Sequence, residues 1–368
     1  MTINSAALAD GAHNMLINCA EVTIHHSVLI IAEPTTDGYY DPGLVSAVAG
    51  AAEQLAARVD VLEYPFDPVV RDPSPELTAR MDASDRVIFL ARLGDQLRFR
   101  PSVKDCFSVM SYALDRGMLA SPFGGVDYAC FETLKSLINE ALTVASEIHV
   151  TCPAGSDFRG PGAHFPGEAG ETTVKRFPLS VFSPIPPQGF SGRIAQVGFL
   201  CATGSQSYDP PACELRDPLF IHFEENWITR FQGSTRDIAA AEAHYDHVAG
   251  LFDLERNFVH SWHAGIHPSC SYDRPANANF DRWSNGAFGN PRLLHFHTCG
   301  RHAPGEISLN IVDPTVRLDG VAVWENGQLR PERIKGGAAL LASNQAFSQA
   351  FANPATAIGL GPSGQLQY

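Results

Sequence analysis

The sequence predicts two fold classes in one chain: an α/β domain with an open parallel sheet, followed by a β-rich α+β domain. In the first part, apolar β-branched runs alternate with amphipathic helical patterns, which is typical of parallel strands joined by crossover helices. After Cys152 the chain changes to short apolar runs broken by Gly and Pro, as in FPLSVFSPIPPQGFSG, which suits antiparallel strands. We therefore expect an α/β domain at residues 1–150 and a β-rich domain at residues 151–368.

Local patterns predict the elements of the first domain. Residues 27–33 (SVLIIAE) form an apolar run of the kind found in strands that are buried on both faces. A helix should follow, because Asp41 and Pro42 suit the N-cap and first-turn positions before an apolar face that continues to Arg58. The other expected elements are a helix within residues 1–20, strands at 59–64, 86–91 and 147–152, helices at 75–81 and 131–145, and, in the β-rich part, a helix at 235–252.

Composition excludes several classes of function. The net charge is −14 and the pI is about 5.4, so no basic excess exists to neutralise nucleic-acid phosphates. No signal-peptide pattern, membrane-length apolar run or nucleotide-binding glycine motif is present, and the eight cysteines form no C-x-x-C pair. We expect a cytoplasmic protein with reduced cysteines and a small-molecule partner, with neither nucleic acid nor membrane as a partner.

Histidine is concentrated near the end of the chain, where 8 of the 14 histidines lie between His244 and His302. Imidazole is the commonest transition-metal ligand and readily transfers protons near neutral pH, so the concentration predicts a metal site. His244 and His247 fall in the helical pattern AAAEAHYDHVAG beside acidic residues, and we interpret them as part of a solvated helix face. The metal site is therefore expected between residues 259 and 306.

Two histidine pairs there have spacings that strands would align. In VHSWHAGIHP, a strand would place His263 and His267 on one face, and Gly265 disfavours a helix. In LLHFHTCG, a strand would aim His295 and His297 at the same face. Glu306 follows nine residues after His297 on an APGE turn, from which a hairpin could return its carboxylate to the same site. The alternative is that these are structural or surface side chains.

Hydrolases with a protein nucleophile fit the sequence poorly. There is no G-x-S-x-G motif, and only Cys299, close to His297 in the chain, is a candidate for a catalytic cysteine.

Four stretches resemble the aminopeptidase T-like metallopeptidase superfamily: CPAGSDFRGPGAHFP, HFEENWITRFQG, WHAGIHP and IVDPTVRLDG. Chain length and the AGSDF motif are most similar to the 2,5-dihydroxypyridine 5,6-dioxygenases, Fe(II) enzymes that open a pyridine ring with O2. The resemblance implies an N-terminal α/β domain, a C-terminal β-rich domain that holds the metal, and a homo-oligomer assembled through the β-rich domain.

The chain departs from the dioxygenase pattern at the ligand positions. Where that family has a His-x-Asp pair before the last motif, this chain has Glu306 and Ser308, and the position of another histidine ligand falls near Ser261. The family's proton-transfer histidine falls at about Asp95. A site rebuilt from the residues present has His263, His297 and Glu306 as metal ligands and His267, His295 or Asp95 as the proton-transfer group.

Two reactions follow from this site. With Fe(II), two histidines and a carboxylate leave open positions for a substrate oxygen and O2, which predicts a dioxygenase that opens a hydroxylated aromatic or heteroaromatic ring. With Zn(II) or Co(II), the same ligands would support an aminopeptidase, an amidase or a cyclic-imide hydrolase. A third possibility is a binding protein without a metal.

Overall fold

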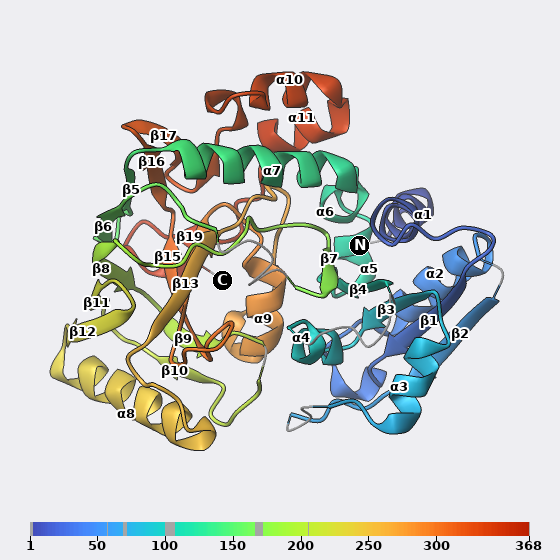
Figure 1. Ribbon diagram of the computed structural model, residues 1–368, viewed down its shortest axis with the longest axis horizontal. Helices are drawn as coiled ribbons and strands as arrows, with labels where there is room; N and C mark the ends of the chain where they lie inside the picture. The colour runs from blue at the N-terminus through green and yellow to red at the C-terminus, as the bar shows by residue number, and fades with distance from the viewer. Residues whose placement is uncertain are drawn as a thin grey trace. The chain divides into compact units, whose positions relative to one another are not determined.

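The computed structural model describes residues 3–56, 58–68, 72–99, 107–165, 172–204 and 206–367 (Figure 1). They divide into two compact units. The first unit comprises Met1–Glu132 and Glu171–Leu179, and the second comprises Thr133–Gly170 and Ser180–Tyr368. The domain boundary that the sequence predicts at residue 150 stays a prediction.

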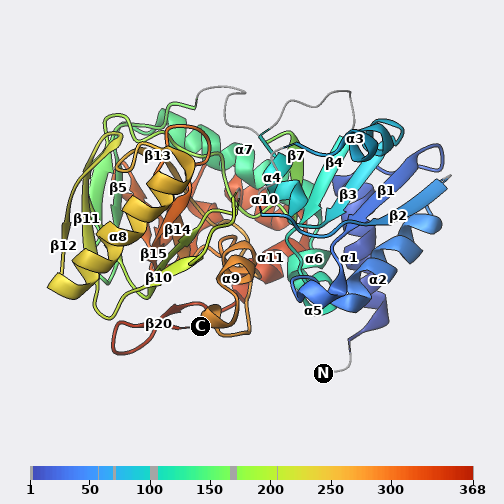
Figure 2. The ribbon, with the colours of Figure 1, turned by 90° about the horizontal axis from the view of Figure 1, so that it is seen from below.

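The first unit contains the expected parallel sheet, with five strands in the order β2-β1-β3-β4-β7. Side chains of α3 and α4 pack on the face that carries Leu29, Ile31 and Phe89. Figure 2 shows α2 on the other side of the sheet from α3. The strands are β1 Ser27–Ala32, β2 Arg58–Glu63, β3 Arg86–Leu90, β4 Phe107–Ser111 and β7 Val174–Phe177.

Several helices of the first unit begin at residues whose side chains cap the helix N-terminus. Asp41 accepts a hydrogen bond from the backbone N–H of Gly43 at 2.8 Å, and Pro42 occupies the first turn, as predicted. The helices are α1 Ser5–His13 with a π-helical continuation Asn14–Cys19, α2 Pro42–Glu53, α3 Pro75–Asp82, α4 Leu93–Leu97, α5 Arg116–Leu119, α6 Pro122–Gly125 and the start of α7 Tyr128–Val144.

The second unit is built from antiparallel sheets, which confirms the predicted β-rich class. An eight-stranded sheet has the order β12-β11-β8-β6-β5-β16-β17-β18, and a five-stranded sheet, called here the histidine sheet, has the order β10-β9-β15-β14-β13. The first sheet contains β5 Ile148–Thr151, β6 Asp157–Gly160, β8 Ser191–Gln196, β11 Leu219–Glu224, β12 Trp227–Gln232, β16 Thr315–Leu318, β17 Val321–Glu325 and β18 Gln328–Leu329. The histidine sheet contains β9 Phe199–Ala202, β10 Ala212–Glu214, β13 Val259–Ala264, β14 Leu293–Thr298 and β15 Ile307–Val312, and β19 Gly359–Leu360 pairs with β20 Leu366–Gln367.

The strand predicted at residues 147–152 is present as β5, but it does not extend the parallel sheet. It pairs antiparallel with β6 and β16 in the second unit. Its burial alternates along the strand, unlike the continuous burial of β1. A half-buried strand of this kind suits an antiparallel sheet, and four residues do not reveal which partner they will find.

An aromatic core joins the eight-stranded sheet and the histidine sheet of the second unit. Phe158 on β6 lies edge-on to Trp262 on β13 and Phe296 on β14, with ring centroids 5.5 and 5.2 Å apart. Since side chains alternate along a strand, the residues on either side of Trp262 and Phe296 point to the opposite face of the histidine sheet. That face carries the histidines and packs against α9 Phe280–Ala287, whose Trp283 meets Phe199 of β9.

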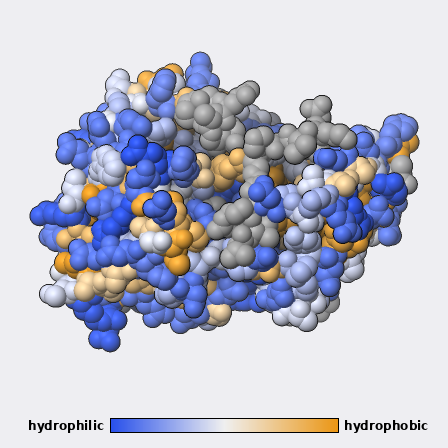
Figure 3. Space-filling model, turned by 60° about the horizontal axis from the view of Figure 1, so that its bottom comes forward, coloured by the Kyte–Doolittle hydropathy of each residue, from blue (hydrophilic) through white to orange (hydrophobic). Residues whose placement is uncertain are grey.

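The remaining helices lie at the periphery of the second unit. In Figure 1, α8 (gold) lies beside β12, and its bounds, Thr235–Phe252, agree with the predicted helix. Among the described residues, no helix is long and apolar enough to cross a membrane. The face in Figure 3 is mostly hydrophilic, with hydrophobic residues in small separate patches. The C-terminal helices are α10 Gly337–Ser343 and α11 Gln345–Ala352.

Candidate metal centre

Strand register brings the histidine pairs together on one face of the histidine sheet. In the antiparallel pairing of β13 with β14, His263 lies opposite His295 and Ser261 lies opposite His297. Directly opposite residues point to the same side of a sheet, so these side chains share a face. On the other side of β14, Ser308 of β15 lies opposite His297, and Asn310 lies opposite His295. The three strands therefore carry two rows of side chains across the sheet, Ser261–His297–Ser308 and His263–His295–Asn310.

Three of these side chains, His263, His295 and His297, form a cluster with the spacing of metal ligands. One ligand atom of each lies within 4.8 Å of the others. The Nε2 atoms of His263 and His297 are 3.1 Å apart, and the ring centroids of His263 and His295 are 4.2 Å apart. All three side chains are buried. We call this group the histidine cluster.

Neighbouring groups orient two of the rings. The Nδ1 atom of His263 lies 2.9 Å from the carbonyl oxygen of Phe182, and a carbonyl only accepts, so Nδ1 carries the proton. In a neutral imidazole this leaves the lone pair on Nε2, the atom that faces His297. Phe288 stacks on His295 with centroids 4.4 Å apart. In metal-binding histidines, the ring nitrogen that does not bind the ion typically donates to a carbonyl or carboxylate oxygen, as His263 Nδ1 does here.

The cluster fits a transition-metal ion. Two nitrogens bound at about 2.0–2.1 Å to one ion lie roughly 3 to 3.5 Å apart at tetrahedral or octahedral angles. The Nε2 separation of 3.1 Å falls in this range, and the 4.8 Å span of the group requires only small ring movements. A hydrogen bond between the two Nε2 atoms would involve two of the rings, whereas an ion would engage all three. Imidazole suits iron, zinc and cobalt alike.

The structure gives Glu306 other contacts. Its Oε1 accepts a hydrogen bond from the amide of Gln206 at 2.9 Å, and its backbone oxygen accepts one from the hydroxyl of Tyr208 at 3.1 Å. Burial first, with the nearby acidic groups, raises the pKa of Tyr208 well above its usual value. Within the described part of the chain, the group with metal-ligand spacing contains histidines only, so the ligand role of Glu306 stays a prediction.

The predicted proton-transfer residues occupy three different places. His295 belongs to the cluster. His267 is buried but follows the end of β13 at Ala264, and its Nδ1 accepts a hydrogen bond from the backbone of Ser269 at 3.3 Å. Asp95 lies in α4 of the first unit, where Tyr112 donates a hydrogen bond to it at 2.7 Å. The proton-transfer roles remain predictions.

Two further histidines lie outside the cluster, and one of them, His244, is more buried than the sequence predicted. His244 was expected on a solvated helix face, but it is 5% exposed and packs beside Tyr208, with ring centroids 5.7 Å apart. Burial, with a smaller effect of His247, lowers the pKa of His244 to about 4. His260 is half-buried, and burial lowers its pKa to about 4 as well. His247 itself is exposed, as predicted.

Three neutral polar residues lie beside the cluster: the sequence analysis named Ser261 and Ser308 only as departures from the family's ligand positions, and it missed Asn310. Ser261, Ser308 and Asn310 lie directly opposite the histidines in the strand register. The hydroxyl of Ser308 donates to the Asn310 side-chain oxygen at 3.3 Å, and the Asn310 amide donates to the Cys201 sulfur at 3.7 Å. The spacing of Ser308 and Asn310 in β15 indicates that their side chains share one face of the strand. The register of β15 against β14, which places them opposite the histidines, is not visible in the sequence.

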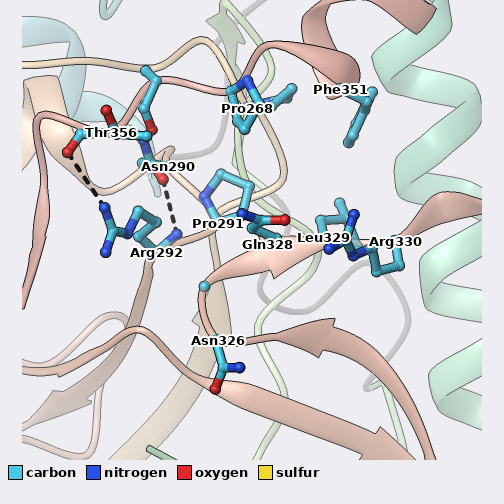
Figure 4. A pocket seen from close by; sticks show the side chains of 13 residues that line it. Pro268, Asn290, Pro291, Arg292, Asn326, Gln328, Leu329, Arg330, Phe351 and Thr356 are labelled. Atoms are coloured by element: carbon cyan, nitrogen blue, oxygen red, sulfur yellow. Dashed lines mark hydrogen bonds between the residues drawn. The ribbon is translucent and has the colours of Figure 1, made fainter. Parts of the chain in front are cut away.

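A separate hollow of about 130 Å³ lies where the loop before β14 meets the β17–β18 turn and the segment after α11 (Figure 4). Arg292 at its wall donates to the carbonyl of Thr356 at 3.3 Å and forms a two-pronged ion pair with Asp313 at 2.5 and 2.9 Å. None of the histidine cluster lines this hollow, so it is distinct from the candidate metal centre.

Comparison with known proteins establishes the class of fold. No protein-family model matches the chain, and no curated protein sequence matches it. Its structure is similar to that of a 2,5-dihydroxypyridine dioxygenase from Pseudomonas putida KT2440, with 17% identity, a TM-score of 0.59, and 89% of this chain and 98% of that chain covered. It is also similar to AmpT from Thermus thermophilus, with 11% identity, a TM-score of 0.50, and coverage of 88% and 99%. The predicted remote resemblance is thereby confirmed at the level of the fold.

Proposed function

We propose that this protein is a metal-dependent enzyme, specifically a non-haem Fe(II) dioxygenase that opens a hydroxylated aromatic or heteroaromatic ring with O2. The observation that carries the proposal is the buried histidine cluster, in which three imidazoles bring ligand atoms within 4.8 Å of one another. The fold similarity to a 2,5-dihydroxypyridine dioxygenase favours this reaction among those that the cluster could support.

His263 and His297 are the best-supported ligands, and Glu306 is the third ligand predicted from the sequence. The hydrogen bond from His263 Nδ1 to Phe182 holds the ring with Nε2 toward His297. Burial under α9 keeps bulk water from the rings, and His295, His267 or Asp95 would take the proton of the substrate hydroxyl. Fe(II) held there would supply open positions for a substrate oxygen and for O2.

A metal-dependent hydrolase is the second candidate. The fold similarity to AmpT and the affinity of imidazole for zinc favour it. Zn(II) or Co(II) would supply Lewis-acid chemistry for hydrolysis of a peptide, an amide or a cyclic imide. In this case too His263 and His297 would hold the ion.

Metal analysis and O2 consumption separate the candidates. The protein purified without oxygen should contain about one iron per chain, or take up Fe(II) stoichiometrically, and should then consume O2 with a dihydroxypyridine or a catechol. Stoichiometric zinc, no O2 uptake and hydrolysis of a peptide or cyclic imide would establish the hydrolase instead. A protein that takes up no divalent metal would refute both.

Three further features belong to the same proposal. The substrate is a small molecule, consistent with the acidic net charge of −14. The seven free cysteines among the described residues agree with a reducing, cytoplasmic location, while Cys106 lies outside those residues. We propose a homo-oligomer on the basis of the sequence resemblance, which size-exclusion chromatography with light scattering would test.

A further inference from the structure

We propose that His263, His295 and His297 are the complete set of protein ligands, and that this uncharged set selects a substrate that chelates through two adjacent oxygens, at least one of them ionised. The inference rests on the proposed metal-dependent function and deepens it. It assigns His295 to the third position, which the sequence analysis assigned to Glu306, and it names the substrate class as catecholates and ortho-hydroxycarboxylates.

The position of His295 supports its role as a ligand. It lies directly opposite His263 in the strand register, and their rings are the closest pair in the cluster, with centroids 4.2 Å apart. Phe288 stacks on the His295 ring, with centroids 4.4 Å apart. β14 is paired on both sides, so its backbone is held by two strands. A ligand on such a rigid element keeps its geometry better than one on a loop.

Glu306 lies in a less suitable place. It precedes β15 by one residue, and its Oε1 is engaged by the Gln206 amide at 2.9 Å. It is not part of the group whose ligand atoms lie within 4.8 Å. To become a ligand, its carboxylate would have to come closer to the three imidazoles, and its second oxygen, Oε2, is the atom that could bind the ion while Oε1 keeps Gln206.

The side chains that share the two strand rows with the cluster are also uncharged. Ser261, Ser308 and Asn310 complete the two rows, and Cys201 lies opposite Ser308 on β9. Burial raises the pKa of Cys201 to about 12, so this thiol is neutral at physiological pH. The rows that contain the cluster therefore bring no negative charge to it.

A divalent ion held by neutral imidazoles keeps its full charge of about +2 in a buried site. Burying uncompensated charge is costly, so binding is strongest for a partner that brings negative charge. A catecholate or an ortho-hydroxycarboxylate brings that charge together with two donors at chelating distance. A neutral monodentate ligand brings neither, which makes charge and chelation the two criteria for selection.

The ligand set is tested by comparing His295→Ala with Glu306→Gln. Co(II) is the probe, and its affinity and visible absorption spectrum are measured in the full chain, with circular dichroism as the folding check. We expect His295→Ala to weaken Co(II) binding at least about 100-fold and to change the spectrum, because loss of even an outer partner costs about 10- to 100-fold. Glu306→Gln should stay within about threefold of the original protein and keep its spectrum. The exposed His302→Ala is the matched control for removing an imidazole from this segment.

The outcomes distinguish this inference from the proposed function. If Glu306→Gln loses the ion and His295→Ala keeps it, the inference is wrong while the metal-dependent function stands. If the original protein binds neither Co(II) nor Fe(II), the proposed function fails.

The charge criterion is tested with Asn310→Asp, which keeps the size of the side chain and adds a negative charge opposite His295. In the Co(II)-loaded protein, this variant should bind catechol at least about tenfold more weakly, a difference of about 1.4 kcal/mol. Binding of imidazole, a neutral monodentate probe, should change less than about threefold. Unchanged catechol affinity, or an equal loss of both probes, would refute selection by charge.

Discussion

Each unit contains a cluster of buried polar side chains that the sequence analysis singled out, and these two clusters differ in what balances them. In the first unit, Asp95 accepts a hydrogen bond from Tyr112 at 2.7 Å and pairs with Arg98, so acid and base neutralise each other inside the protein. In the histidine cluster, nitrogen faces nitrogen across 3.1 Å. The first arrangement is complete without a ligand, whereas the second could hold a metal ion. Burial alone therefore does not mark a site; the chemical identity of the facing atoms does.

The strongest test of this difference is His297→Ala. We expect the variant to fold and to lose its bound metal, because His297 supplies the Nε2 atom that faces His263. Inductively coupled plasma mass spectrometry after dialysis against Fe(II) measures the loss, and His302→Ala should keep a full complement. Full metal content in His297→Ala would remove this residue from the site.

The corresponding change in the first unit is Asp95→Ala, which should affect stability. It leaves the buried Arg98 without its carboxylate, and breaking a buried pair on one side typically costs about 3–5 kcal/mol. Urea denaturation of the metal-free protein measures this free energy of unfolding, with exposed Asp10→Ala as the control. A loss below about 1 kcal/mol would show that the pair does little for the fold, and would favour the proton-transfer role predicted for Asp95.

His244 allows a smaller test that depends on pH. Burial lowers its pKa to about 4, from 6.5 for an unperturbed histidine, so the unfolded chain binds a proton more readily than the folded chain between these values. The contribution is fully present above pH 6.5 and is lost as the pH falls toward 4. We expect roughly 1–3 kcal/mol of pH-dependent stability from this residue.

Urea denaturation of the metal-free protein at pH 7.5 and pH 5 checks the effect. His244→Gln should lose less stability than the original protein on acidification, whereas the exposed His247→Gln should behave like the original. Identical losses in all three would contradict the assignment.

The smallest effect is expected at Asp41, whose contribution is local to one helix. Asp41→Ala removes the acceptor for the Gly43 N–H and should cost about 1 kcal/mol in urea denaturation. Asp41→Asn keeps an acceptor oxygen and should recover most of this stability, although it weakens the ion pair with Arg116, which lies at 3.2 Å. If both variants are equally unstable, the ion pair matters more than the cap.

Much of the fold could be predicted because its signals are local. Asp41 and Pro42 marked the start of α2, and the predicted helix at residues 235–252 matches α8. The prediction that His295 and His297 share a strand face is also confirmed. Alternation along a strand follows from backbone geometry alone, so two positions in LLHFHTCG were enough to predict it.

The rest of the candidate site could not be predicted, because it depends on pairing between distant segments. His263 meets His295 only through the register of β13 against β14, and Ser308 and Asn310 join them through β15. His267 was expected on the same face as His263, but β13 ends at Ala264 and the chain leaves the sheet. A register shift of one residue would reverse every side chain on a strand, and local propensity does not select the register.

By itself, the sequence determined the two fold classes, several helix and strand positions, chiefly in the first unit, and the concentration of imidazoles in one segment. These follow from backbone preferences and from the burial of apolar residues, which act over a few neighbours. Tertiary structure decided that β5 joins the second unit and that His295, and not Glu306, belongs to the group with metal-ligand spacing. Both depend on which strands pair and in what register, a choice made by long-range packing of whole strand faces.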